Sequence, residues 1–447
     1  MNKNKTLSKV WNHWRSWLRV GMGVKRWLMI LGFGALVAGA GIGSFLMALR
    51  QWQLLPLELY RILTLQFLPV GLRILLPLIV GGLIIFAAIL RLGSNLVAPF
   101  RRPGERVSDS LYLYTQRNRG PRIVAIGGGT GMPSLLRGLV AYTSNITAIV
   151  TVADDGGSSG RLRKELGVLP PGDFRNNIAA LSRDETLMTQ LWQYRFGGNV
   201  NGNEDPSADR SELQGHAFGN LLLAALTGIT GSFDEALLAA GQVLAMQGRV
   251  LPSTLENVVL AADVEIEGDT GLRRVTGESA IPKSGGQIRR VYLEPANVPA
   301  YPPAVQAILQ ADIVVMGPGS LYTSILPNLL VPDIARALQQ TKAFRVYVCN
   351  LATQPGETDN YTVADHVAEM NRHVAMQNVN NRSWIDVVLA NDNLSIAPDA
   401  GGGYTIFVRP VRPAHEKMVT VDLIDEQQPW RHDSQKLARA VVELVVL

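Results

Sequence analysis

The hydrophobic positions of this chain change their pattern near residue 120. Before it, two long runs carry no charge, residues 27–49 and residues 74–90. At about 1.5 Å per helical residue, the first run can cross an apolar bilayer core of about 30 Å. The second lies between Arg73 and Arg91, and it gains residues 68–70 if the Arg73 side chain reaches back to the membrane surface. The pattern predicts two transmembrane helices, forming a hairpin over residues 27–91.

A secretory signal is the alternative interpretation of the first run, because the small residues 38–41 could form a cleavage site. Its apolar part would be shorter, about 7–15 residues. Charge favours the hairpin: residues 1–26 hold seven basic residues and no acidic one, whereas the segment between the runs holds three Arg and one Glu. The positive-inside rule then places both ends in the cytoplasm. We expect a basic cytoplasmic arm over 1–26, a juxtamembrane linker over 92–119 and a two-pass protein of the cell (inner) membrane.

From residue 121 onward, short apolar runs alternate with segments of helical apolar spacing. This alternation predicts one α/β domain over residues 120–447, a Rossmann-like doubly wound, mostly parallel sheet with helices on both faces. Residues 258–293 contain short β-like runs separated by glycine-rich turns. This pattern predicts a small antiparallel excursion from the main sheet. Residues 197–214 predict a surface loop that either covers a ligand or is an inert insertion.

Charge and cysteine content narrow the classes of partner. Residues 1–119 hold 16 of the 42 Lys and Arg but only 3 of the 37 Asp and Glu, so residues 120–447 carry a net charge of −8. An acidic domain does not favour nucleic-acid binding. The single cysteine, Cys349, excludes an intramolecular disulfide, and its apolar surroundings predict a buried small side chain.

The first candidate for chemistry is the loop Gly127–Gly131, which follows the apolar run 122–126 and precedes a helical segment. Its residues Gly128, Gly129, Thr130 and Gly131 could bring backbone N–H groups and a helix N-terminus to a phosphate or diphosphate. The spacing differs from the dinucleotide fingerprint G-x-G-x-x-G, and no Walker lysine follows. A tight turn that binds nothing is the alternative.

Further polar residues follow other predicted strands. Asp154 and Asp155 can accept from ribose hydroxyls or hold a divalent ion such as Mg²⁺ with Asp173, and a solvated turn is the alternative. His216 and Asn220 are four apart and would share a helix face. A second strand–glycine–helix unit contains Gly317 and Gly319, and no histidine cluster indicates zinc. The remaining candidates line the same expected strand edge: Ser158, Ser159, Arg161, Arg175, Asn176, Asn177, Ser320, Tyr322 and Asn350.

Six ordered motifs together resemble a known family. They are GGGTG, DDGGSSG, PPGDFRNN, GHAFGN, GPGSLYTS and NLATQPGET, spread over residues 127–358. They are similar to those of the YvcK (gluconeogenesis factor) family, which is related to CofD, the 2-phospho-L-lactate transferase. The resemblance covers roughly residues 120 to 430.

The resemblance implies a nucleotide-binding domain, with UDP-sugar binding on the YvcK side and GDP, a divalent metal and a deazaflavin acceptor on the CofD side. We expect a UDP-sugar-binding regulator that links carbon metabolism to cell-envelope growth and cell shape. A metal-dependent CofD-like transferase is the rival, although the loop with the DDGGSSG motif, residues 154–160, has the YvcK form. An NAD-dependent oxidoreductase would need the regular glycine spacing. A homo-oligomer and an unidentified protein partner are compatible with each interpretation.

Overall fold

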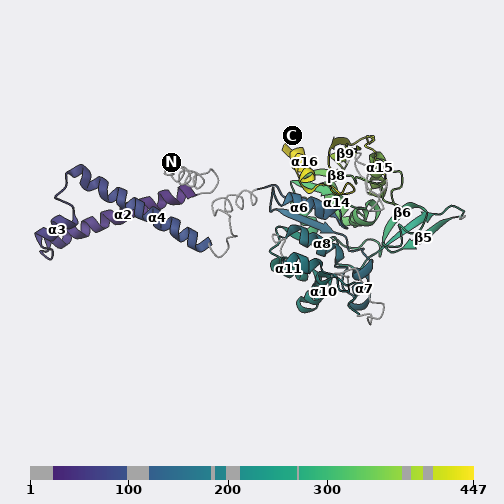
Figure 1. Ribbon diagram of the computed structural model, residues 1–447, viewed down its shortest axis with the longest axis horizontal. Helices are drawn as coiled ribbons and strands as arrows, with labels where there is room; N and C mark the ends of the chain where they lie inside the picture. The colour runs from purple at the N-terminus through teal and green to yellow at the C-terminus, as the bar shows by residue number, and fades with distance from the viewer. Residues whose placement is uncertain are drawn as a thin grey trace. The chain divides into compact units, whose positions relative to one another are not determined.

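The computed structural model describes residues 24–97, 120–182, 187–197, 212–268, 271–374, 384–395 and 406–446. The chain divides into two compact units, Met1–Gln116 and Arg117–Leu447. Most of the expected basic arm and juxtamembrane linker, and most of the expected loop 197–214, lie outside the described residues. The first unit is helical, and the second contains all the described strands (Figure 1).

The N-terminal unit contains α2 (Val24–Gln51), α3 (Leu57–Leu63) and α4 (Val70–Val97). Within α2, residues 32–51 are long and apolar enough to cross a membrane. One helix among the described residues is a candidate span, and the second predicted span stays a prediction, because the described part of α4 includes a shorter apolar stretch, Val70–Ile85. Arg73 lies inside it and bonds the carbonyls of Gln66 and Leu68.

The C-terminal unit is built on a seven-stranded sheet in the order β10-β9-β8-β7-β1-β2-β3, and every pairing in it is parallel. The strands are β1 (Ile123–Gly127), β2 (Ile146–Val150), β3 (Arg249–Pro252), β7 (Ile313–Met316), β8 (Phe344–Val348), β9 (Val387–Asn391) and β10 (Lys417–Val421). The central strands are apolar and wholly buried, as expected when helices cover both faces. The α/β prediction is confirmed.

The helices of this unit lie between and after its strands. They are α6 (Met132–Leu139), α7 (Gly157–Leu166), α8 (Gly172–Leu181), α9 (Leu187–Gln193), α10 (Phe218–Thr230), α11 (Phe233–Val243), α12 (Pro302–Gln310), α13 (Leu326–Leu329), α14 (Pro332–Gln340), α15 (Val363–Val374) and α16 (Ser434–Val446), with a π-helix at Leu321–Ile325. Helix α6 packs on α8 and α16, whereas α12 packs on α14.

The predicted antiparallel excursion is a separate three-stranded sheet in the order β5-β4-β6. Its strands are β4 (Val259–Glu265), β5 (Leu272–Thr276) and β6 (Gln287–Glu294), and β5 and β6 extend away from the large sheet (Figure 1). The connection between β5 and β6 contacts the large sheet's end of the domain. There the backbone N–H of Ser279 donates to Oδ1 of Asp155 at 2.9 Å.

The strand order determines where the domain can hold a ligand. From β1 the chain moves outward through β2 to β3, then returns to β7 on the other side of β1 and moves outward again. The order therefore reverses between β1 and β7. In open α/β sheets, the carboxyl ends of the strands beside such a reversal form the ligand crevice.

Candidate functional site

Two glycine loops meet at the reversal between β1 and β7. The strands pair in parallel from Ile123 opposite Ile313 to Ile126 opposite Met316, so both loops leave the same sheet edge. They touch: a Cβ added to Gly131 would lie 2.7 Å from the carbonyl oxygen of Pro318. Only glycine permits this approach at position 131.

A cavity of about 300 Å³ opens between these loops. Of the predicted residues, the following line it: Gly129, Thr130, Gly131, Gly319, Ser320 and Asn350. In the part of the chain that the structure describes, no hydrogen bond occupies the backbone N–H of Thr130 or Gly131. These groups precede the N-terminus of α6, which favours an anion.

The loop after β7 is held in place by two side chains from the segment that follows β8, Asn350 and Glu357. Asn350 bonds the backbone of Gly319 twice, accepting from its N–H at 3.1 Å and donating to its carbonyl at 2.8 Å. Ser320 Oγ accepts from the backbone N–H of Thr323 at 3.1 Å, and its hydroxyl donates to Glu357. The loop is therefore preorganised beside the cavity.

Two carboxyl groups on the cavity wall were not among the predicted site residues. Glu357 follows Asn350 in the NLATQPGET motif, and burial raises its pKa to about 7. Glu278 comes from the connection between β5 and β6, and its pKa is raised well above its usual value by burial and then by Asp154 and Asp173. Position 278 carries no sequence signal, because the antiparallel sheet delivers it to the site.

The carboxyl of Asp173 binds the backbone of the first glycine loop, Gly127–Gly131. Its Oδ2 accepts from the backbone N–H of Gly129 at 2.7 Å, so that amide already has an anionic partner within the chain. Burial, and next the charge of Asp154, raise the pKa of Asp173 to about 7. A side chain at Gly128 would clash with this carboxyl, since its Cβ would lie 2.6 Å from Oδ2.

The predicted metal ligands Asp154, Asp155 and Asp173 each have a backbone partner, and their role in holding an ion stays a prediction. Each carboxyl accepts from a different backbone N–H: that of Gly156 for Asp154, that of Ser279 for Asp155 and that of Gly129 for Asp173. No group of three or more His, Cys, Asp or Glu among the described residues could hold an ion. Burial raises the pKa of Asp154.

Ser158, His216 and Asn220 converge on one point. Asn220 Nδ2 donates to Ser158 Oγ at 3.0 Å, and the same oxygen lies 3.0 Å from Nδ1 of His216. With Asn220 as donor, the serine hydroxyl can donate to the imidazole, whose pKa is lowered by burial. The expected shared helix face is wrong, because α10 begins at Phe218, after His216.

The remaining candidates in and next to the DDGGSSG and PPGDFRNN motifs lie beside the cavity rather than on its wall. Ser159 Oγ accepts from the backbone N–H of Gly172 at 3.0 Å and so joins the two loops. Arg161 donates to the carbonyl of Gln214 at 2.8 Å, and Asn177 donates to the carbonyl of Asp173 at 2.8 Å. These contacts stabilise the loops themselves.

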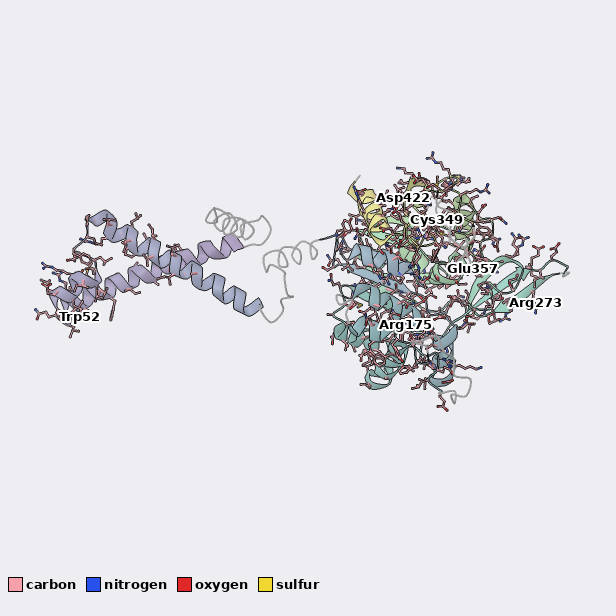
Figure 2. The ribbon with its side chains drawn as sticks, in the orientation of Figure 1. Trp52, Arg175, Arg273, Cys349, Glu357 and Asp422 are labelled. Atoms are coloured by element: carbon pink, nitrogen blue, oxygen red, sulfur yellow. The ribbon has the colours of Figure 1, made fainter. Side chains whose placement is uncertain are left out.

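Arg175 is only 5% exposed, yet its Nε and Nη1 have no partner among the described residues. Its Nη2 donates to Oδ1 of Asn176 at 3.0 Å. Burial and the charge of Arg195 lower its pKa to about 10. Figure 2 labels Arg175 and Glu357, which come from opposite halves of the sheet.

Tyr322 is a core residue rather than a ligand contact. Its side chain is fully buried, and its hydroxyl lies 2.9 Å from that of Tyr361. Its ring stands edge-on to His373, and burial raises its pKa. The motif predicted a polar side chain at the sheet edge, but the π-helix turns this one inward.

The far end of the chain supplies the last part of the cavity wall: Trp430, Arg431 and His432. Burial lowers the pKa of His432 to about 4, and its Nε2 has no partner in the described part of the chain. The sequence motifs do not predict these three residues as part of the site. The available signal was an aromatic and two basic side chains following a strand's carboxyl end.

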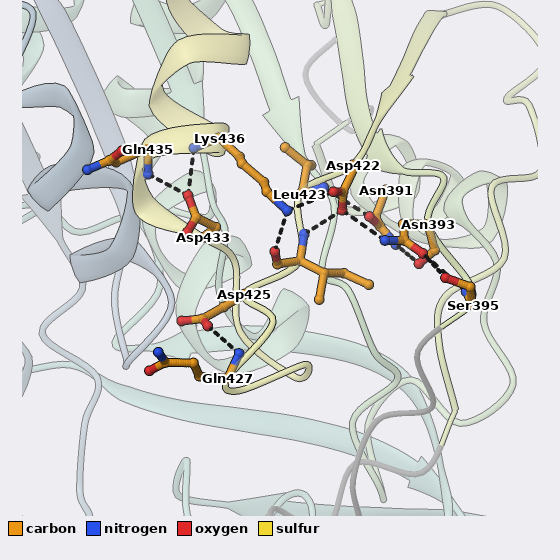
Figure 3. Close-up of polar contacts among 11 residues, drawn as sticks. Asn391, Asn393, Ser395, Asp422, Leu423, Asp425, Gln427, Asp433, Gln435 and Lys436 are labelled. Atoms are coloured by element: carbon orange, nitrogen blue, oxygen red, sulfur yellow. Dashed lines mark hydrogen bonds and ion pairs between the residues drawn. The ribbon is translucent and has the colours of Figure 1, made fainter.

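A polar network holds the segment that carries this triplet (Figure 3). Lys436 Nζ donates to Oδ2 of Asp422 at 2.7 Å and to the carbonyl of Ile424 at 3.0 Å. Asn391, at the end of β9, accepts from the backbone N–H of Leu423 at 3.1 Å. Asp433 caps α16 by accepting from two backbone N–H groups. The segment is thereby anchored on both sides of residues 430–432.

Comparison with known proteins gives consistent matches across this chain. Residues 123–446 match the family model described as 2-phospho-L-lactate transferase CofD. A Nostoc sp. protein whose name contains the term gluconeogenesis factor is 42% identical over 461 residues, covering 99% of this chain and 94% of its own. The gluconeogenesis factor of Bacillus subtilis is 45% identical over 334 residues, covering 73% of this chain and 98% of its own. A crystal structure of a Bacillus halodurans protein superposes with a TM-score of 0.62 at 40% identity, covering 72% and 99%.

Proposed function

Because this chain belongs to the CofD family, and within it to the gluconeogenesis factors, we propose that it binds a nucleotide sugar in the cavity between β1 and β7. One observation carries the proposal: two glycine loops meet at the point where the strand order reverses, and the first presents backbone N–H groups, those of Thr130 and Gly131, that have no partner in the described part of the chain. A UDP-sugar is the ligand that this family membership favours most. The bound protein acts as a regulator rather than a catalyst.

The diphosphate would lie against the backbone N–H groups of Thr130 and Gly131. Arg431, exposed at the cavity mouth, supplies a fixed positive charge, and the hydroxyls of Ser134 and Ser324 supply further donors. The half-buried indole of Trp430 offers an apolar surface for a base or a sugar ring. The cavity thus provides the anionic and the stacking contacts that such a ligand needs.

The acidic wall suits the sugar end of the ligand. Glu357, with a pKa of about 7, can be neutral near physiological pH, and Glu278 is shifted in the same direction. A neutral carboxyl can both donate to and accept from a sugar hydroxyl, and it does not repel a nearby diphosphate. The wall therefore favours a polyhydroxylated group over a second anion.

The regulatory role concerns the link between carbon metabolism and cell-envelope growth and shape. We further propose that the helix over residues 32–51 tethers the protein to the inner membrane, with the α/β domain in the cytoplasm. Its apolar length supports tethering, and the basic residues before it support the orientation. A second membrane span is not part of this proposal.

Isothermal titration of the full chain in detergent with UDP-sugars, UDP and GDP tests the proposal. Arg431→Gln removes a charged contact, and we expect affinity for the UDP-sugar to fall about 10- to 100-fold. Arg439→Gln is the matched control, because Arg439 is exposed on α16 and bonds Glu443 instead. Equal affinities for the two variants would remove the cavity from the proposal.

A CofD-like transferase is the second candidate, favoured by the name of the matching family model. The two functions differ in product. Incubation of the wild-type protein with UDP-sugar and Mg²⁺ should return the ligand unchanged by mass spectrometry. Conversion over several turnovers would move the protein to the transferase class.

A further inference from the structure

The imidazole of His432 has a ring nitrogen without a hydrogen-bond partner, although the residue is buried. His432 is only 7% exposed, and it lines the cavity between the two glycine loops. Its Nε2 has no partner in the part of the chain that the structure describes. A buried polar atom that is left unpaired costs free energy, so its partner is to be sought outside the chain, in whatever fills the cavity.

The other ring nitrogen determines which kind of partner Nε2 can take. The imidazole bonds the backbone of Cys349, and since Nε2 is unpaired, Nδ1 makes this bond. The N–H of Cys349 donates to the carbonyl of Leu389 at 3.0 Å, so the Cys349 carbonyl is left to accept from the imidazole. Burial lowers the pKa of His432 to about 4, so the ring is neutral at pH 7 and carries a single N–H. Nε2 is therefore an acceptor, and only a hydrogen-bond donor fits it.

The same backbone segment positions His432 and the second glycine loop. Cys349, which bonds the imidazole, directly precedes Asn350, whose side chain bonds the N–H and the carbonyl of Gly319 at 3.1 and 2.8 Å. His432 and the amides proposed for the diphosphate line one cavity of about 300 Å³, so a single ligand can contact both.

We propose that His432 determines the specificity of the cavity, because its Nε2 accepts a hydrogen bond from a hydroxyl group of the bound ligand. This role rests on the proposed function, since it presumes a nucleotide sugar in the cavity. Such a ligand carries hydroxyls on its ribose and on its sugar, and both offer the same uncharged donor. A phosphate or carboxylate oxygen without a proton cannot make this bond.

A metal ion is the other common partner of an imidazole nitrogen. Among the described residues, no group of three or more His, Cys, Asp or Glu could hold one. The cavity wall therefore favours a hydroxyl as the partner of Nε2.

Isothermal titration of the full chain in detergent tests this role with UDP-glucose and with analogues that each lack one hydroxyl, either on the ribose or on the glucose. We expect wild-type affinity to fall about tenfold for one of these analogues, because Nε2 is then left unpaired. The position of that hydroxyl shows whether His432 contacts the ribose or the glucose.

His432→Asn removes the acceptor with little change to the anchor, since the Asn amide can still donate to the Cys349 carbonyl but places no atom at the position of Nε2. This variant should bind UDP-glucose about tenfold more weakly than the wild type and should not distinguish it from the decisive analogue. His415→Asn is the matched control, because His415 is exposed and does not line the cavity, and it should discriminate like the wild type. Circular dichroism checks that both variants are folded.

A wild type that binds UDP-glucose and every analogue equally well would overturn the role of His432 and leave the proposed function in place. The role would also be overturned if His432→Asn lost as much affinity as the wild type for the same analogue, because another residue would then contact that hydroxyl. A wild type that binds no UDP-sugar would overturn the proposed function, and the role of His432 with it.

Discussion

Replacing His432 by Asn should change how the stability of the α/β domain depends on pH. His432 is buried, and burial lowers its pKa from the usual 6.5 to about 4, against a hydrogen bond with the backbone of Cys349 that raises it. Below pH 6.5 the unfolded chain binds a proton at this position that the folded chain does not bind until about pH 4. His432 therefore contributes stability at neutral pH that is lost as the pH falls through this window.

The shift of His432 spans between two and three pKa units, each worth about 1.4 kcal/mol, so the loss should reach about 3 kcal/mol. Other groups act in the opposite direction. The raised pKa values of Asp173 and Glu357 make the folded state less stable as the pH rises from about 4 to 7. The wild-type curve is a sum of both effects, and only its difference from the variant isolates His432.

Urea unfolding of residues 120–447, followed by fluorescence at intervals between pH 7.5 and 4, provides this difference. A fragment is appropriate because the Bacillus subtilis relative matches this domain over 98% of its own length. The stability advantage of the wild type over His432→Asn should shrink by about 3 kcal/mol across the range. A difference that stays constant with pH would refute the assignment of a buried neutral imidazole.

Two further predictions concern the glycine loops. Asp173→Asn removes a negative charge beside the proposed diphosphate. The affinity for the UDP-sugar should therefore rise about tenfold at pH 8, where Asp173 is ionised, and change little at pH 6. Calorimetry at both pH values measures the affinity, and weaker binding at both would show that Asp173 holds the ligand. Asn350→Ala leaves the N–H and carbonyl of Gly319 without their side-chain partners and should lower the free energy of unfolding by about 1–3 kcal/mol, with exposed Gln427→Ala as the control. An Asn350→Ala variant as stable as the control would show that the loop after β7 holds its shape without that side chain.

The roles of three acidic residues depend on hydrogen bonds that the sequence does not reveal. Asp154, Asp155 and Asp173 follow one another in the chain and suggest a shared ion. In the fold, each carboxyl accepts from a separate backbone N–H, and Asp155 instead fastens the antiparallel sheet to the domain through Ser279. Residue type and spacing predict which side chains can hold a ligand. They do not predict which of them the backbone has already engaged.

The sequence by itself determined the elements and their class, because apolar periodicity and glycine turns are local properties. Alternating buried strands and helices indicate the α/β domain, and the glycine loops predict a phosphate-binding edge of its sheet. Family motifs identified the relatives. Only the tertiary structure decided that β7 returns beside β1, since strand pairing joins residues 190 positions apart. The same long-range packing brought Glu278 and residues 430–432 to the cavity and turned Tyr322 inward, because each outcome depends on which segments meet rather than on what each segment is.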